Sequence, residues 1–345
     1  LGFIMQFAGI LMIVPAIFGT VLNELESAAS IYLAVISMSL TGFILNTLGE
    51  KSTLNLKQSS IVVVSSFTLL SLYGSLPYMY VNPFDLNSDY LSLFVSSVLE
   101  SSSGYTTTGL TTIENPESLP ESFVFYRSYT QWVGGLSFVY LVMALYYPET
   151  KLSTMRNMIG GGILKFKQLL STISIIFVFY TIIFILLIFF LGNIHLIESV
   201  SLTFTTLVTG GFIPDSTIFD SLNSYQLIVI MAGMIIAALP FGFHYGIFSK
   251  EVKSRRLSME IIVYLFFVLL LAVLFVIIEP SISTHDWLTS IFHVVSASTT
   301  TGFSFINLSY LSVEGKLFLI LVMLVGGTAF STAGGIKIAR LLLIL

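Results

Sequence analysis

Three short segments that are rich in threonine and end in glycine carry residue types suited to binding a bare cation. They are Tyr105-Thr106-Thr107-Thr108-Gly109-Leu110, Leu207-Val208-Thr209-Gly210-Gly211-Phe212 and Thr299-Thr300-Thr301-Gly302-Phe303-Ser304. Backbone carbonyl oxygens in an extended loop can replace the hydration shell of an ion without a full charge that would trap it. Glycine permits the backbone angles that turn carbonyls inward, and threonine hydroxyls add ligands or brace the loop.

The spacing of the three segments indicates an internal repeat. Gly109, Gly211 and Gly302 are separated by 102 and 91 residues, so the whole unit repeats and not only the motif. A single Thr-Thr-Thr-Gly would be an ordinary polar turn. Three copies in equivalent positions favour a filter that binds a dehydrated cation, and its candidate residues are Thr107, Thr108, Gly109, Thr209, Gly210, Gly211, Thr300, Thr301 and Gly302.

Composition places these loops in a membrane. Of the 345 residues, 55% are hydrophobic and 9% are charged, and the mean hydropathy is +0.96, which indicates an integral membrane protein. The sequence has no cysteine, which excludes thiolate metal sites, disulfides and cysteine nucleophiles within it.

Apolar segments predict an all-α protein with eight membrane-spanning helices. The expected spans are residues 1–22, 27–48, 59–81, 121–147, 168–192, 222–248, 257–278 and 313–343. Three shorter segments, at about 90–104, 195–206 and 285–298, are too short to cross and should enter and return from one side. The pattern is an outer helix, a re-entrant pore helix, a filter loop and an inner helix, repeated in tandem.

Four sequence segments follow from this pattern. Residues 1–57 form an introductory helix pair, 58–155 a first pore repeat, 156–253 a second, and 254–345 a third with a broken inner helix.

The basic residues predict the orientation. If the N-terminus is cytoplasmic, all but two of the 14 Lys and Arg residues fall inside, the exceptions being Arg127 and Lys316. The cytoplasmic set is Lys51, Lys57, Lys151, Arg156, Lys165, Lys167, Lys250, Lys253, Arg255, Arg256, Lys337 and Arg340. Lys337 and Arg340 are interpreted as anchors at the cytoplasmic surface.

The pore helices should favour cations, because each points its partly negative C-terminal end toward the membrane centre. Glu100 and His293 each lie nine residues before their filter glycine, and Leu202 holds that place in the second repeat. For these two side chains we favour hydrogen bonds that brace the filter over direct contact with the ion, because a carboxylate at depth is costly unless it is partnered.

A glycine-rich segment interrupts the last expected span: Gly326, Gly327, Thr328, Ala329, Phe330, Ser331, Thr332, Ala333, Gly334 and Gly335. Four glycines at about 1 kcal/mol each make a continuous helix improbable. We expect a break in mid-membrane that serves as a flexible gate below the filter. The alternative is a seam of small residues for helix packing.

The sequence resembles the Trk, Ktr and HKT superfamily of potassium and sodium transporters, and most of all its bacterial and archaeal TrkH branch. The resemblance rests on the three filter motifs, on Phe125-Tyr126-Arg127-Ser128-Tyr129-Thr130-Gln131-Trp132-Val133-Gly134-Gly135, and on Gly334-Gly335-Ile336-Lys337. It implies four repeats of outer helix, pore helix and inner helix in a pseudo-fourfold pore, of which this sequence holds three. A fourth filter would then fall near residue 400, so we expect the sequence to be a fragment of a longer chain. The resemblance further implies a homodimer, a cytoplasmic nucleotide-binding regulatory ring and a prokaryotic plasma membrane. It also implies that glycine in the first filter, here Gly109, goes with potassium selectivity.

Together these features predict potassium uptake through a carbonyl-lined filter, with potassium as the transported ion, no cofactor, lipid as the surroundings and no nucleic-acid partner. One alternative is a sodium- or proton-coupled symporter, which would need paired helix interruptions in inverted halves. An intramembrane hydrolase is less favoured, because His195, His244, His285 and His293 form no known catalytic motif.

Overall fold

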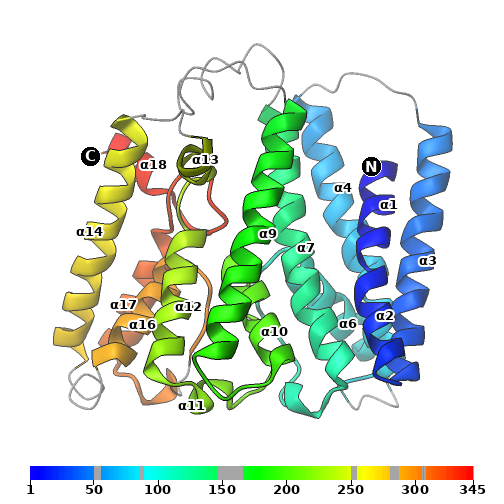
Figure 1. The fold of residues 1–345 in the computed structure, drawn as a ribbon, viewed down its shortest axis with the longest axis horizontal. Helices are drawn as coiled ribbons and strands as arrows, with labels where there is room; N and C mark the ends of the chain where they lie inside the picture. The colour runs from blue at the N-terminus through cyan, green and yellow to red at the C-terminus, as the bar shows by residue number, and fades with distance from the viewer. Residues whose placement is uncertain are drawn as a thin grey trace. The chain divides into compact units, whose positions relative to one another are not determined.

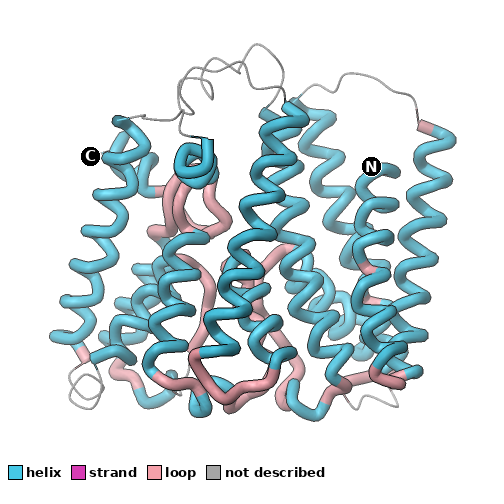
Figure 2. The backbone as a smooth tube through the Cα atoms, in the orientation of Figure 1, coloured by secondary structure: helices cyan, strands magenta, loops and turns pink. Residues whose placement is uncertain are grey.

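The computed structural model describes residues 1–49, 56–84, 89–146, 166–249, 255–279, 287–304, 306 and 308–344, and every regular element in them is helical. Several residues that enter the predicted orientation and site lie outside these ranges: Lys51, Lys151, Arg156, Lys165, Lys250, Lys253 and His285. The described part of the chain has the all-helical composition that the sequence predicts (Figure 2).

The chain forms two compact units, of which the first comprises residues 1–145, 200–205 and 212–218. Its helices are α1 (Gly2–Leu11), α2 (Ile13–Val21), α3 (Leu25–Leu48), α4 (Leu56–Gly74), α5 (Leu76–Val81), α6 (Tyr90–Tyr105), the 3-10 turn η1 (Pro116–Ser118) and α7 (Glu121–Tyr146). In Figure 1, α1 and α2 follow one another along α3. Helix α4 packs on α6, and α6 leads into the first filter loop.

The second unit comprises residues 146–199, 206–211 and 219–345. Its helices are α9 (Phe166–Phe190), α11 (Ile218–Ser221), α12 (Ser224–Ala237), α13 (Phe241–Ser249), α14 (Arg255–Ile278), α16 (Trp287–Ser298), η2 (Leu308–Tyr310), α17 (Val313–Leu324) and α18 (Ile338–Ile344). Helix α10 (Leu196–Leu207) contributes residues to both units.

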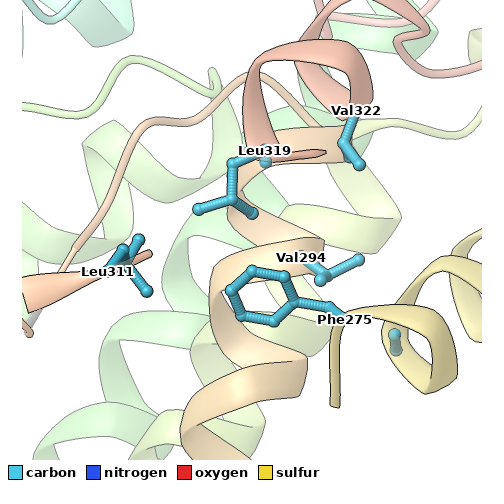
Figure 3. Packing of buried hydrophobic residues seen from close by; sticks show 7 residues of the cluster. Phe275, Val294, Leu311, Leu319 and Val322 are labelled. Atoms are coloured by element: carbon cyan, nitrogen blue, oxygen red, sulfur yellow. The ribbon is translucent and has the colours of Figure 1, made fainter. Parts of the chain in front are cut away.

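A cluster of apolar side chains holds the third repeat together within the second unit. Figure 3 shows Phe275 of α14 and Val294 of α16 near Leu319 and Val322 of α17. Phe275 and Val294 are fully buried. The outer, pore and inner helices of this repeat therefore share one core, and this core positions the filter loop that follows α16.

The three short segments form helices close to the predicted bounds. Helix α6 has 16 residues, and α10 and α16 have 12 each, so at 1.5 Å per residue each is too short for a 30 Å hydrocarbon core. The carboxylate of Asp89 caps α6 by accepting from the N–H groups of Leu91 and Ser92. Glu198 accepts from His195 N in a capping box that starts α10.

Five helical segments of the described residues are long and apolar enough to span a membrane, and a sixth is added if α12 and α13 count together. The five lie within or close to the predicted spans 1–22, 27–48, 59–81, 168–192 and 257–278. Helix α7 is not among them, although it covers the predicted span 121–147 and is 26 residues long. By these criteria the described residues do not reach the predicted eight spans.

The prediction of a continuous helix over 222–248 is wrong. Helices α12 and α13 are bent by 104° at residues 238–240. Pro240 explains the break, because proline lacks an N–H and disfavours helical geometry at the residue before it. The predicted interruption of the last span is confirmed, since α17 ends at Leu324 and α18 begins only at Ile338.

The packing of α7 on the end of α6 generates a stability prediction. A Cβ atom at Gly134 would overlap the carbonyl group of Tyr105, which belongs to rigid backbone. Gly134→Ala should therefore destabilise the protein by about 2 kcal/mol or more, as overpacking does. In an unobstructed helix the same change would stabilise the protein by about 1 kcal/mol. A melting midpoint below that of the parent protein would therefore confirm the close packing at Gly134, and a higher midpoint would contradict it.

Candidate functional site

The three filter loops share one unusual backbone conformation. In each loop a threonine has a positive φ, at +54° for Thr107, +52° for Thr209 and +57° for Thr300. The glycine two residues later also has a positive φ, of +79°, +86° and +84° at Gly109, Gly211 and Gly302. A β-branched residue rarely adopts this region, at a cost on the order of 1–3 kcal/mol. The same strained pair therefore occurs three times.

Helix termination explains the left-handed threonine. After α6, Thr107 N–H donates to Gly104 O and Thr108 N–H donates to Ser103 O, the paired bonds of a Schellman motif. After α16, Thr300 N–H and Thr301 N–H repeat the pattern with Ala297 O and Ser296 O. Helices α6 and α16 thus end in a turn that leads into the filter loop, with threonine where glycine is usual. After α10, Thr209 N–H likewise donates to Thr206 O.

Threonine hydroxyls brace the first and third loops. Thr106 and Thr108 bring their Oγ1 atoms to 2.7 Å, and Thr299 and Thr301 bring theirs to 2.8 Å. Hydroxyls that bond each other in this way favour the bracing role over the alternative role as ion ligands. A Cβ at Gly302 would meet no atom within 4 Å, so this glycine borders open space. A side chain at this position would have room in that space, but the positive φ would make its backbone conformation unfavourable.

A buried ion pair stands behind the first filter loop. Glu100 on α6 is fully buried and lies 3.4 Å from Nη2 of Arg127 on α7, which is 2% exposed. Oε1 of Glu100 accepts from Thr111 Oγ1 at 2.7 Å and from Thr112 N at 2.5 Å. Glu100 therefore braces the chain just after the filter, as the sequence predicts for this position. Arg127, interpreted as an outer charge, is in fact part of this buried network.

The same helix α7 contacts the chain that follows the second filter. The guanidinium of Arg127 lies over the ring of Phe212, 4.7 Å from its centroid. Gln131, one turn further along α7, accepts from Phe212 N at 3.3 Å. These residues all belong to the first unit. Arg127 thus contacts both the bracing carboxylate of the first repeat and the exit of the second filter.

The third repeat replaces the carboxylate with histidine. His293 on α16 is 3% exposed, its Nδ1 lies 2.7 Å from Thr289 O, and its Nε2 lies 3.3 Å from Ser304 Oγ. Ser304 comes two residues after Gly302, so His293 also reaches the chain after its filter. Leu202 at the equivalent place on α10 is fully buried. The bracing positions therefore carry an acid, an apolar residue and a histidine.

The glycine-rich segment 326–335 forms an irregular loop whose two arms touch. A Cβ at Gly326 would overlap the backbone of Gly334 and Gly335, and Gly335 has a φ of +68°. Ile336 N–H donates to Leu324 O, and Ile338 N–H donates to Gly327 O, which closes the base of the loop. Because the arms approach at backbone distance, only glycine fits at their crossing.

The break between α12 and α13 receives this loop. Ala238 O accepts from both the N–H and the hydroxyl of Thr328, at 3.0 and 2.7 Å, and Ala237 O accepts from Thr332 Oγ1 at 2.9 Å. In return, Phe241 N–H donates to Phe330 O at 2.9 Å. Backbone groups that a straight helix would have paired internally are bonded to the loop instead.

The loop also bonds two filter threonines. Thr209 Oγ1 donates to Thr332 O at 3.2 Å, and Gly334 N–H donates to Thr300 Oγ1 at 2.6 Å. Both threonines are the left-handed residues of their filter loops. The second filter, the third filter and the glycine-rich loop, all in the second unit, therefore form one hydrogen-bonded assembly.

Sequence reasoning missed three contributors to this site. The first is the pair of free carbonyls at Ala237 and Ala238, for which the sequence offered one indication, namely that Pro240 argues against a continuous helix. The second is Glu260, whose carboxylate accepts a hydrogen bond from Ala329 N–H in the loop. The sequence indicated it by placing a single charge in an otherwise apolar span. Lys337 was interpreted as a surface anchor, but its Nζ donates to Ala333 O and lies 3.4 Å from Ser331 Oγ.

Comparison with known proteins identifies relatives of this arrangement. The sequence matches the TrkH family, described as cation transport proteins, over residues 29–280 and 276–345. An uncharacterized cation transporter of Methanocaldococcus jannaschii is 31% identical over the whole chain, which covers 70% of that protein. The Trk system potassium uptake protein TrkH of Escherichia coli K12 is 28% identical over 86% of the chain, which spans 63% of its length.

A solved structure has the same fold. The crystal structure of the potassium transporter TrkH from Vibrio parahaemolyticus superimposes with a TM-score of 0.83 over 99% of this chain and 72% of that one. The two sequences are 23% identical, so this comparison establishes the fold alone.

The buried pair behind the first filter generates a double-mutant prediction. Glu100→Gln and Arg127→Met should each cost about 3–5 kcal/mol, because each leaves the other charge buried without its partner. The double variant should lose less than the sum, with a coupling of about 1–3 kcal/mol. Melting midpoints of the purified protein measure this, with exposed Glu117→Gln as control. Additive losses would show that the pair does not act as a unit.

Proposed function

Because the chain belongs to the TrkH family of cation transport proteins, we propose that it forms part of a potassium uptake pathway and that the three filter loops bind the ion. Potassium would bind the backbone carbonyls at Thr107, Thr108 and Gly109 and at the equivalent positions of the second and third loops. The observation that carries the proposal is the same left-handed threonine and glycine pair in all three loops. Alternation between left- and right-handed backbone is a way to turn successive carbonyls toward one side.

The names of relatives support potassium as the ion. Proteins from Escherichia coli and Halomonas elongata that are 28% identical to this chain are named Trk system potassium uptake protein TrkH. Gly109 is consistent with potassium as the ion, because the family resemblance implies that glycine at this position of the first filter goes with potassium selectivity. Inward flow needs no chemical reaction, since a membrane potential of 100 mV contributes about 2.3 kcal/mol per ion.

The rival functions fit less well. A coupled symporter would have interruptions in inverted halves. Here both breaks, at 238–240 and 325–337, fall in inner helices that follow a filter loop. A hydrolase is not supported, because the family is one of transporters and not of enzymes. His244 and His293 each bond a backbone carbonyl, which is a structural use of the ring.

The architecture that we propose around this filter keeps the four segments 1–57, 58–155, 156–253 and 254–345. The three repeats would surround one pore that a fourth repeat completes. The N-terminus would be cytoplasmic and the membrane a prokaryotic plasma membrane. By family resemblance, the complete protein would be a homodimer that binds a cytoplasmic nucleotide-binding ring, and no resident cofactor is proposed.

Transport and selectivity test the filter. The full-length protein should restore growth of cells that lack potassium uptake at low external potassium. In vesicles, rubidium influx with sodium competition should lose its preference for the larger ion on Gly109→Ser, because a side chain at a positive φ changes the carbonyl positions. An unchanged preference for potassium over sodium in that variant would contradict the assignment of the filter.

The gate is tested by deletion. Removing Thr328 to Ala333 should raise rubidium flux per molecule several-fold, because the segment that bonds both the α12–α13 break and two filter threonines is gone. Flux should be normalised to inserted protein. A flux that only falls in proportion to protein abundance would instead support the packing-seam interpretation.

A further inference from the structure

Glu260 has no place in the filter, yet it lies half-buried in the first turn of an apolar span. Helix α14 contains the most apolar candidate span of the described residues, Met259–Ile278, whose most apolar 18 residues have a mean hydropathy of 3.5. Glu260 is the one charged residue in that span. One side of α14 is exposed here, with Met259 and Ile262 at 55% and 60%, whereas Ile261 and Tyr264 are buried, so Glu260 lies where the helix meets the rest of the protein. An ionisable residue in such a span marks a functional position whose partner should be identified.

The partner of Glu260 is the tip of the glycine-rich loop. Its Oε1 accepts from Ala329 N–H at 2.6 Å, although the two residues are 69 positions apart. A hydrogen bond to an ionised carboxylate is roughly twice as strong as one between neutral groups. Thr328 on one side of Ala329 and Phe330 on the other bond backbone groups of the α12–α13 break. Glu260 therefore adds a charged contact between two neutral ones.

Lys337 holds the returning arm of the same loop with the opposite charge. Its Nζ donates to Ala333 O, and it attracts the carboxylate of Glu260 electrostatically. A carboxylate thus accepts a hydrogen bond from a backbone N–H at the tip of the loop, and an ammonium donates one to a backbone C=O on the returning arm. Each ion bonds the backbone group whose dipole suits its sign, and both side chains are half-buried, where such contacts are stronger than in water.

We propose that Glu260 is a positioning residue that latches the glycine-rich loop in its closed arrangement. For the loop to leave the α12–α13 break, Ala329 N–H must leave the carboxylate, and Lys337 then remains to compensate the charge. The outer helix of the third repeat would therefore help to set how often the pathway opens. This inference rests on the proposed function in one respect, namely that the loop is the gate.

The test uses the full-length protein in proteoliposomes with two substitutions at the latch. Glu260→Gln keeps an oxygen acceptor of the same shape without the charge, and Glu260→Leu removes the acceptor from an apolar helix. Glu279→Gln is the matched control, since Glu279 directly follows the last residue of α14, about 28 Å along the helix from Glu260. It accepts from Ser312 N at the start of α17. Deletion of Thr328 to Ala333 is the reference for an absent gate.

Loop position is measured separately from transport. None of the 345 residues is cysteine, so Ala329→Cys introduces the first thiol of this sequence at the latch point, and its rate of reaction with a water-soluble maleimide reports exposure. Glu260→Leu should speed labelling about tenfold and Glu260→Gln about threefold, in line with the loss of a charged or a half-strength hydrogen bond. Rubidium flux should rise in the same order, and Glu279→Gln should match the parent.

The outcomes separate the two proposals. Parental labelling in both Glu260 variants would overturn the latch, whatever the flux, and so would an equal increase in Glu279→Gln. If deletion of the loop leaves flux unchanged, the gate assignment fails, while faster labelling in Glu260→Leu would still establish that Glu260 positions the loop. If Glu260→Leu fails to insert, Glu260→Gln decides alone, because it preserves size and shape.

Discussion

Backbone polar groups that leave a helix inside a bilayer must find partners within the protein, and this constraint accounts for most of the site. The chain leaves helical geometry at the three filter loops, at residues 238–240 and at 325–337. Schellman turns close the ends of α6 and α16. The other two irregular segments satisfy each other, since the carbonyls of Ala237 and Ala238 accept from the loop that interrupts the last span.

The strained backbone of the filter loops is retained because contacts with neighbouring segments of the protein hold it in place. A left-handed threonine is costly, and glycine would relieve that cost at once. At Thr209 and Thr300 the hydroxyl that glycine lacks bonds the glycine-rich loop, so the strained residue also links its own loop to the glycine-rich loop. Glu100 and His293 hold the chain on the far side of their filters. In the function that we propose, loops held in this way would keep their carbonyl groups in place while an ion loses its water.

Charge is used sparingly and is bonded wherever it is buried. Glu100 pairs with Arg127, and the carboxylate of Glu260 pairs with a backbone N–H in the neighbourhood of Lys337. An unpaired ion at these depths would cost several kcal/mol, so each pairing limits how its segment can move. The arrangement differs between repeats, with acid, leucine and histidine at equivalent places. Glu100 and His293 brace the chain after their loops by hydrogen bonds, whereas Leu202 is a buried apolar side chain.

The sequence alone determined what depends on local signals. The length of the apolar segments and the threonines that follow them placed α6 and α16 with starts within two residues of those observed. The density of glycine located the break after Leu324. Only the tertiary structure decided the angle of the bend at Pro240 and the partners of the carbonyls freed there, the burial of Arg127, and the contact of Glu260 with Ala329. The partners in these contacts lie 27 to 95 positions apart in the sequence. Hydropathy cannot tell a charge in water from one bonded to a distant backbone group, because that difference arises only when the helices pack.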